Sequence, residues 1–243
     1  MRALVTNDDG VRSPGLSLLA DAAQRRGVDV LVVAPSYDAS GSGASMTAVS
    51  SEGRVIVDSV AGTHALHGPP AFIVRSAVYG AFGPPPDVIL SGVNRGLNVG
   101  RAVIHSGTVG AALTGGTYGC RSMAVSADVH DGEWDTITPV VEAAVGWLLD
   151  APEAAVLNVN IPHFDGPSPP ARATVLSERG TVQGNVTDTA GEMVPVTFDD
   201  GRLPAPGTDA AALAEGFVSV SAIRSVVDDD TFDLPELISR YRP

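Results

Sequence analysis

Lysine is missing from this sequence of 243 residues, in which all 15 basic residues are arginine. An arginine-only basic set is most simply a consequence of genome composition, yet it still excludes some chemistry. A Walker-type phosphate-binding loop needs its lysine, and a Schiff base needs a lysine amine. Enzymes that depend on either group are therefore excluded.

Cysteine is almost absent as well, since Cys120 is the only one. One thiol cannot form an intramolecular disulfide or build a multi-cysteine zinc or iron–sulfur site. Aromatic residues make up only 5% of the chain, so the core must consist mainly of Val, Leu, Ile and Ala. The hydrophobic fraction of 44% is ordinary for a globular protein and allows a sizeable core.

Positive charge is scarce, because 28 acidic residues against 15 basic ones give a formal net charge of −13. This balance argues against a nucleic-acid polymer or an anionic membrane as a partner. A small anionic substrate stays open, because a metal ion or local cations can reverse the field at one site. The apolar run after Arg2 is too short for a signal peptide, and no stretch approaches a membrane span. We therefore expect a cytoplasmic protein.

The order of the expected elements is typical of an α/β protein with a mostly parallel sheet. Residues 2–6 are a short apolar run, 13–27 carry helix signals, and 28–35 are a continuous β-branched run. Such runs are typical of parallel strands buried on both faces, and this order predicts a right-handed βαβ unit. Further strands are expected at 87–90, 121–127 and 154–162, an antiparallel edge strand at 53–59, and helices from 70, over 108–119 and over 133–149.

The composition changes after residue 161, which we take as a boundary between a catalytic domain over 1–161 and an extension over 162–243. Residues 162–206 are rich in Pro, Gly, Asp and Thr, with strand-like pieces at "ATVLSE" and "MVPVTFDD". We expect a β-arm or hairpin outside the main sheet, and the 154–162 strand as the last of the domain's buried strands. The rest of the extension predicts a short helix ("TDAAALAEG"), a returning strand ("FVSVSAI") and a terminal helix ("DLPELISRY").

Three polar loops follow three of the expected strands. "NDDG" follows the first strand, "SYDASGSGAS" the second, and "SGVNRGLNVG" the strand at 87–90. Ligands of open α/β sheets bind at the carboxyl ends of the strands, so we expect the loops to converge at one edge. Together they offer hard oxygen ligands or hydrogen-bonding groups: Asn7, Asp8, Asp9, Ser40, Ser42, Asn94 and Asn98.

The adjacent pair Asp8 and Asp9 indicates a metal ion. Two carboxylates a few ångströms apart repel each other unless a cation lies between them. Hard oxygen ligands favour Mg²⁺, Mn²⁺ or Ca²⁺, and none of the three loops offers a thiol. The alternative is that one aspartate forms an Asx-turn while the other is solvated.

Ser106, Gly107 and Thr108 lie where the helix at 108–119 is expected to begin. Free backbone N–H groups and the helix dipole form an anion site there, and Gly107 lets a phosphate approach the main chain. The alternative is an ordinary N-cap by Ser106 or Thr108. Beside an oxygen-ligand metal site, this segment predicts a phosphoester between the ion and the helix.

The sequence resembles the SurE (survival protein E) family in the order and spacing of six segments. They are "LVTNDDGVRSPGL", "VVAPSYDASGSGAS", "DVILSGVNRGLNVG", "HSGTVGAA", "LNVNIP" and "TDAAALAEGFVSVS". That family consists of metal-dependent acid phosphatases that act as 5′/3′-nucleotidases. The resemblance implies a Rossmann-like three-layer α/β/α fold with a mostly parallel sheet. It also implies a C-terminal extension that is exchanged between the protomers of a homodimer or homotetramer.

Carried over by position, the resemblance implies hydrolysis of nucleoside monophosphates with one divalent ion, Mg²⁺ or Mn²⁺. The metal ligands fall on Asp8, Asp9, Ser40 and Asn94. The expected catalytic residues are Asp8, Asp9, Asn94 and His105, and the expected phosphate- or substrate-binding residues are Asn7, Ser42, Asn98, Ser106, Gly107 and Thr108.

Three positions depart from the family pattern. His105 stands where a tyrosine is usual, Thr114 replaces an acidic residue, and Phe72 replaces an aspartate. Because the metal set is intact, we expect hydrolysis with an altered pocket wall and substrate preference. His105 could donate to a phosphate or protonate a leaving group.

Other interpretations have weaker support in the sequence. Aspartyl-phosphate phosphatases also place an aspartate after the first strand, but they need two acids separated by one residue and a downstream lysine. This chain has adjacent acids there and no lysine, which excludes them. A nucleotide-binding module with weak hydrolysis, or a phosphatase for a specialised metabolite, stays as an alternative. Arg95 and Arg101 could meet phosphate, whereas surface or interface roles are favoured for His64 and His67, and core or interface roles for Trp134 and Trp147.

Overall fold

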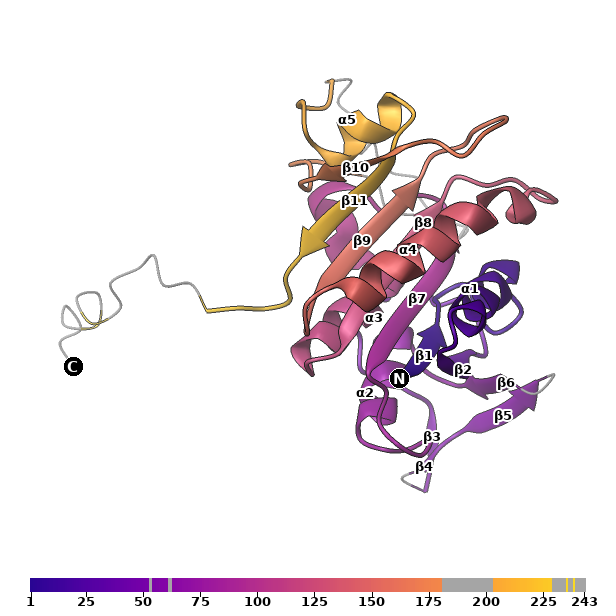
Figure 1. Cartoon of the computed structure of the whole chain (residues 1–243). Helices are drawn as coiled ribbons and strands as arrows, with labels where there is room; N and C mark the ends of the chain where they lie inside the picture. Colours follow the sequence, from indigo (N-terminus) through magenta and orange to yellow (C-terminus); the bar gives the residue numbers. More distant parts are fainter. Residues whose placement is uncertain (53, 61–62, 181–202, 229–234, 236–237, 239–243) are drawn as a thin grey trace, which may run out of the picture.

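A computed structural model of the chain shows one central sheet between two layers of helices (Figure 1). The structure describes residues 1–243 except 53, 61–62, 181–202, 229–234, 236–237 and 239–243. No helix in the part of the chain described here is long and apolar enough to cross a membrane.

The main sheet has nine strands. They are β1 (Arg2–Thr6), β2 (Asp29–Pro35), β5 (Val57–Val60), β6 (Thr63–Leu66), β7 (Val88–Arg95), β8 (Arg121–Ala127), β9 (Val156–Ile161), β10 (Ala171–Thr174) and β11 (Val218–Ile223). A separate antiparallel pair consists of β3 (Ser50–Ser51) and β4 (Arg54–Val55). The helices are α1 (Pro14–Arg25), α2 (Pro70–Val78), α3 (Gly107–Thr117), α4 (Thr138–Asp150) and α5 (Asp209–Ala214), with 3₁₀ helices η1 (Gly100–His105) and η2 (Trp134–Ile137).

The strand order is β10-β11-β9-β8-β7-β1-β2-β6-β5. β11 runs antiparallel to β9, and β5 runs antiparallel to β6. Every other neighbouring pair in this sheet is parallel. The expected α/β fold with a mostly parallel sheet is confirmed. The order in which the strands are added reverses at β1, which lies between its parallel neighbours β2 and β7.

The core lies on both faces of the sheet, which explains the continuous apolar runs in its strands. Leu19 of α1 and Val141 of α4 belong to the larger hydrophobic cluster on one face. On the other face, Ile73 of α2 and Ala111 of α3 pack with Leu4 of β1. Burial on both faces removes the period-two pattern that a half-exposed strand would show.

Two predicted boundaries were wrong. The strand expected at 87–90 continues to Arg95, so half of the expected loop "SGVNRGLNVG" is strand β7. Hydrogen bonding to β1 and β8 on its two sides outweighs its Gly and Asn content. The helix expected over 133–149 is divided into η2 and α4. Proline has no backbone N–H to donate, which a helix tolerates only in its first turn, so α4 begins at Thr138 with Pro139 next.

The expectation that 162–206 stays outside the main sheet was wrong for its first strand. β10 spans residues 171–174, which include the first two residues of "ATVLSE" (173–178), and it pairs parallel with β11 at the sheet edge. The returning strand and the short helix are confirmed. The edge strand expected at 53–59 is divided into β4, which pairs with β3, and β5, which forms the antiparallel edge of the main sheet. "MVPVTFDD" lies outside the described residues, and so does most of "DLPELISRY".

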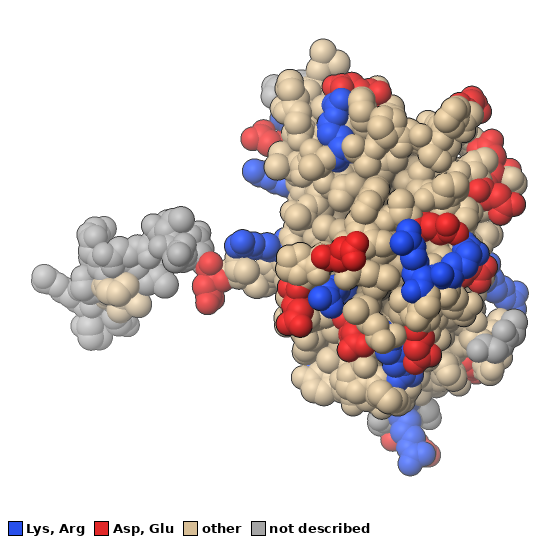
Figure 2. Space-filling model, viewed as in Figure 1, with Lys and Arg blue, Asp and Glu red and all other residues tan. Residues whose placement is uncertain are grey.

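Charged side chains are distributed over the surface rather than gathered by sign. On the face that Figure 2 shows, arginines and acidic residues are interspersed among uncharged residues. The described part of this face carries no continuous basic area of the kind that follows a nucleic-acid backbone.

Candidate phosphate and metal site

The turn after β1 is closed by the side chain of Asn7. Its Nδ2 donates to the Gly10 carbonyl at 3.0 Å, and its Oδ1 accepts from the Gly10 N–H at 3.2 Å. Gly10 has a φ of +95°, which favours glycine. Asn7 was expected to bind phosphate, but its side chain forms the Asx-type turn that was considered above for one of the aspartates. Asp8 and Asp9 lie within this turn and are held by it.

Asp8 is buried against the N-terminus of α3. Its Oδ2 accepts a 3.0 Å hydrogen bond from the Thr108 N–H, and its Oδ1 accepts one from the Thr108 hydroxyl. Burial raises the pKa of Asp8 above its ordinary value, although the bonds from Thr108 oppose the shift. The N-terminus of α3 therefore orients the Asp8 carboxylate, but its hydrogen bonds offset only part of the cost of burying the charge.

Asp9 is half-buried beside Asp8 and accepts a 3.4 Å hydrogen bond from the Arg95 N–H. Burial, followed by the neighbouring charge of Asp8, raises the pKa of Asp9 to about 6. Two adjacent carboxylates in this environment are poorly stabilised as anions. A divalent cation is the partner that would stabilise both.

The two other predicted ligands come from loops that are tied to this pair. The N–H of Ala39, the neighbour of Ser40, donates to the Asp8 carbonyl at 2.7 Å. Asn94 precedes Arg95, whose N–H contacts Asp9. The structure therefore brings the loop after β2 and the end of β7 to the same point as Asp8 and Asp9.

Ser40 and Asn94 both have an oxygen left for a cation. Nδ2 of Asn94 donates to the carbonyls of Arg95 at 3.2 Å and Gly96 at 2.7 Å, which leaves its Oδ1 as an acceptor. The Ser40 hydroxyl donates to Asp38 at 2.6 Å and keeps its lone pairs. The donor set is thus two carboxylates, one hydroxyl and one amide oxygen, which suits a hard divalent cation.

The side chains of Asp8 and Ser42 lie close against the backbone at Gly107. The Ser42 hydroxyl is buried and has no hydrogen-bond partner within the described residues. A Cβ added to Gly107 would lie 2.7 Å from Ser42 Oγ and 2.9 Å from both Cβ and Oδ2 of Asp8. The missing side chain at Gly107 thus lets Asp8 and the unpaired Ser42 hydroxyl approach the start of α3 closely.

The start of α3 combines two of the predicted roles. Ser106 is the N-cap, because its hydroxyl accepts a 3.1 Å bond from the Val109 N–H. Thr108 bonds to Asp8, so its N–H and hydroxyl hold that carboxylate. The N-terminus of α3 thus faces one anionic group, the carboxylate of Asp8.

Asn98 and His105 lie at the border of the site, and their hydrogen bonds go to partners other than Asp8 and Asp9. Asn98 is buried; its Nδ2 donates to Ser126 Oγ and its N–H to Asn160 Oδ1, both at 2.8 Å. These bonds anchor the loop before η1 to strands β8 and β9. His105 is exposed at the end of η1, and its carbonyl accepts from the Gly43 N–H at 3.1 Å.

A hollow of about 580 Å³ opens beside Asp9. Sequence reasoning did not select Arg12, Tyr37 or Asp38 from its walls, and it favoured a surface or interface role for His67. The hollow is lined by Asp9, Gly10, Val11, Arg12, Ser36, Tyr37, Asp38, Asp58, Val60, Ala65 and His67. The signal that could have found Tyr37 and Asp38 is their position in the polar loop after β2.

None of the three family departures, Phe72, His105 and Thr114, lines this hollow. Phe72 packs against the cluster between α2 and the sheet. The hydroxyl of Thr114 donates to the Gly110 carbonyl within α3 at 2.7 Å. The expected change of the pocket wall is therefore not seen at Phe72 or Thr114.

Asp209 was also missed by sequence reasoning, which used "TDAAALAEG" only as a helix signal. Its carboxylate is fully buried and accepts bonds from the Gly100 N–H at 2.7 Å and the Ser177 N–H at 2.9 Å. Gly100 begins η1, which leads into α3. The C-terminal part of the chain thus supports the segment that positions Ser106 to Thr108.

The fold and this geometry define a Rossmann-like α/β protein in which oxygen-bearing side chains gather at the carboxyl edge of the sheet. Beyond that class, the chain belongs to the SurE family, since the family described as Survival protein SurE matches residues 3–183.

Curated relatives and a solved structure are similar over nearly the whole chain. The chain is 35% identical over 239 residues to a 5′/3′-nucleotidase SurE of Shigella dysenteriae, covering 92% of this chain and 90% of that one. It is 36% identical over 238 residues to a 5′-nucleotidase SurE of Laribacter hongkongensis, covering 92% of each. The SurE protein of Aquifex aeolicus superposes with a TM-score of 0.76 at 27% identity, covering 99% of this chain and 98% of that one.

Proposed function

We propose that this protein is a divalent-metal-dependent phosphomonoesterase that hydrolyses nucleoside monophosphates to nucleoside and phosphate. The observation that carries the proposal is the buried carboxylate pair Asp8 and Asp9, with Asp8 held by the N-terminus of α3. The names of the relatives, 5′- or 5′/3′-nucleotidase, support this reaction and substrate class.

The proposed cofactor is one Mg²⁺ or Mn²⁺ ion held by Asp8, Asp9, Ser40 and Asn94. Their oxygen atoms and the buried hydroxyl of Ser42 support this assignment. When bound, such an ion polarises a phosphoryl oxygen and lowers the pKa of a water.

The chain's own groups would then carry out the transfer. Asp9 orients the attacking water and takes its proton as the water oxygen bonds to phosphorus. The backbone N–H of Gly107 would stabilise a non-bridging oxygen as the ester P–O bond breaks. The leaving alcohol oxygen needs a proton, and His105, exposed at the rim, is the residue we assign to supply it.

The nucleoside part of the substrate is proposed to lie in the hollow beside Asp9. Its walls offer the Tyr37 ring and the polar side chains of Arg12, Asp38 and His67. The hollow shares Asp9 with the candidate metal site, so a phosphate at the ion would place its ester group at the hollow's mouth. Such a wall suits a polar ring-bearing group better than an aliphatic one.

Substitution of the aspartates tests the proposal. Asp8→Asn and Asp9→Asn should each abolish phosphate release, because an amide cannot neutralise the cation or accept the proton. The control is Asp21→Asn, an exposed position on α1, which should keep full activity. Phosphate release from nucleoside monophosphates and sugar phosphates is measured with Mg²⁺, with Mn²⁺ and with EDTA. Full activity of either Asn variant, with an intact fold by circular dichroism, would refute the metal-site role.

The same assay separates the alternatives. Turnover of a sugar phosphate alone would support an enzyme for a specialised phosphorylated metabolite. Metal binding without turnover on any substrate would support a nucleotide-binding module. Loss of turnover with EDTA and recovery with Mn²⁺ or Mg²⁺ is the expected result.

We also propose a homodimer or homotetramer in which the C-terminal extension is exchanged between protomers. The described residues after β11 support this, because Val226 is 98% exposed and Val227 is 66% exposed. In Figure 1 the chain leaves the body of the molecule after β11. Two exposed valines such as these are stabilised when a second copy of the chain covers them. A cytoplasmic location remains a prediction.

A further inference from the structure

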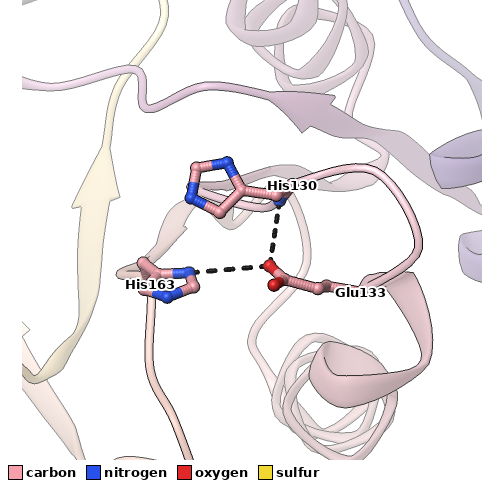
Figure 3. Close-up of side chains that lie close together, drawn as sticks. All are labelled: His130, Glu133 and His163. Carbon is pink, nitrogen blue, oxygen red and sulfur yellow. Dashed lines mark hydrogen bonds and ion pairs between the residues drawn. The ribbon is translucent and has the colours of Figure 1, made fainter.

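A second group of metal-ligating side chains lies apart from the residues assigned above. His130, Glu133 and His163 each present a ligand atom, and these atoms lie within 4.8 Å of one another. Figure 3 shows the two imidazole rings and the Glu133 carboxylate turned toward a common point. None of the three belongs to the site at Asp8 and Asp9.

The sheet topology brings the two histidines together. His130 follows β8 and His163 follows β9, and these two strands are parallel neighbours whose last residues, Ala127 and Ile161, are paired. The two loops are joined further by a 2.9 Å bond from the Asp128 N–H to the Ile161 carbonyl. The ring centroids lie 4.9 Å apart as a result.

Glu133 is fixed to His130 by a short turn. The Glu133 N–H donates to the His130 carbonyl at 3.2 Å, and Glu133 Oε2 accepts from the His130 N–H at 3.2 Å. The same Oε2 lies 3.7 Å from Nδ1 of His163. The carboxylate therefore lies beside the His163 ring and is held by the backbone of His130 (Figure 3).

Each histidine is also anchored through a neighbour in the core. Val129, before His130, is buried, and Phe164, after His163, packs against the main hydrophobic cluster. The side chains themselves remain accessible, since those of His163 and Glu133 are 36% and 40% exposed. A solute can therefore reach a cluster whose backbone is held in place.

Two imidazoles and one carboxylate form a donor set that Zn²⁺ uses in sites with an open fourth position. In a tetrahedral zinc site, neighbouring ligand atoms are roughly 3.3 Å apart, as follows from metal–ligand distances of about 2.0–2.1 Å. The contact of 3.7 Å between Glu133 and His163 is already close to this value. Small rotamer changes would bring His130 to the same distance.

We propose that His130, Glu133 and His163 form a surface site for a borderline divalent transition-metal ion, with Zn²⁺ as the representative. Its nitrogen donors distinguish it from the oxygen-ligand site, which suits Mg²⁺ or Mn²⁺. The chain would thus hold two cation sites of different selectivity on the carboxyl edge of one sheet. The neighbouring ion pair between Asp131 and Arg95 connects the loop that carries this site to the end of β7.

Zinc titration of the full-length protein tests the proposal. Isothermal titration with ZnCl₂ is done in excess Mg²⁺, which occupies the oxygen site. Wild type should bind Zn²⁺, and His130→Ala, His163→Ala and Glu133→Gln should each weaken binding. Loss of an outer partner of a metal ligand already costs about 10–100-fold, so loss of a ligand should cost about 100-fold or more.

Matched controls identify the site. His64→Ala, at an exposed position on β6, and Glu153→Gln, also exposed, should bind Zn²⁺ as wild type does. Asp9→Asn should keep Zn²⁺ binding as well, although it is expected to abolish turnover. Equal Zn²⁺ binding by wild type and a His130→Ala/His163→Ala double variant would overturn the proposal, as would loss of binding in Asp9→Asn alone. Melting curves in EDTA verify that each variant is folded, and failure of the nucleotidase assay would leave this result unaffected.

Discussion

At the residue scale, Asp8 and Asp9 are placed for binding at the expense of local stability. Burial raises the pKa values of both carboxyl groups, and for Asp9 the charge of Asp8 adds to the effect. Arg95 meets Asp9 through its backbone N–H, while its side chain pairs with Asp131. The Arg95 guanidinium is paired with Asp131, so a bound metal ion would be the cation that favours ionisation of Asp8 and Asp9.

The metal-free protein should become less stable as pH rises through the range in which Asp9 ionises. The folded-state pKa of Asp9 is raised from 3.8 to about 6, so the folded state holds its proton longer than the unfolded state does. The free energy of unfolding then falls between about pH 4 and pH 6, by at most about 3 kcal/mol from this group.

Asp9→Asn isolates this effect. In EDTA at pH 7 the variant should melt at a higher temperature than wild type, and the difference should vanish near pH 4. Thermal unfolding by circular dichroism across this range is the measurement. A wild type that is more stable than the variant at pH 7 in EDTA would contradict the account of Asp9.

Tyr37 tests the placement of the nucleoside. The residue lines the hollow beside Asp9 and is 47% exposed. Tyr37→Ala should raise KM for a nucleoside monophosphate several-fold, because stacking on a base contributes about 1–3 kcal/mol. Tyr79→Ala is the control, since Tyr79 is exposed after α2 and does not line the hollow. Steady-state kinetics that show equal KM values for both variants would remove the nucleoside from this hollow.

At the scale of single elements, α3 connects the site to the fold. Its first turn holds Asp8 through Thr108, and its glycines allow close approach to the loop after β2. A Cβ on Gly110 would lie 2.3 Å from the Gly43 carbonyl oxygen. Glycine lowers intrinsic helix propensity, but at Gly110 the packing of α3 against the loop after β2 requires it.

Thr108→Val should show how much the first turn of α3 contributes to orientation. The substitution keeps the shape and the backbone N–H but removes the hydroxyl that bonds to Asp8. The lost bond to a charged group should cost about 1.5–3 kcal/mol, and kcat should fall more than KM changes. The control is Thr117→Val at the exposed end of the same helix. Unchanged kcat in Thr108→Val would show that Asp8 is oriented by other groups.

At the scale of the whole molecule, the C-terminal part completes the sheet and supports the site. β11 covers the edge of β9, and Asp209 holds both Gly100 and Ser177 through their N–H groups. The segment after β11 then exposes Val226 and Val227. These features agree with an extension that belongs to the fold up to β11 and reaches outward beyond it.

Removal of residues 224–243 should therefore reduce the oligomeric state and leave the sheet intact. Sedimentation should show a smaller particle than the full chain gives, because the exchanged segment is lost. The far-ultraviolet spectrum and the metal-dependent unfolding shift should be retained. The matched control is Val226→Leu, which keeps the segment apolar. A truncated protein with the mass of the full-length assembly would contradict the exchange.

Some of the fold could be read from the sequence because its signals were local. Apolar runs predicted β1 and β2, because strands buried on both faces carry that pattern locally, and β8 and β9 were also predicted from their own residues. β7 and β10 were partly missed. Pairing with neighbouring strands, which short-range sequence does not record, extends β7 to Arg95 and draws residues 171–174 into the sheet.

The amino-acid sequence by itself determined the kind of chemistry. Without lysine and with one cysteine, the chain was restricted to oxygen, imidazole and guanidinium groups, and the adjacent acids called for a cation. Only the tertiary structure decided which groups meet. It set Asn7 in the turn, gave Thr108 to Asp8, and joined His130 to His163 across two parallel strands. The reason is that residue types fix the donors available, whereas contacts between distant segments depend on strand order, register and backbone approach.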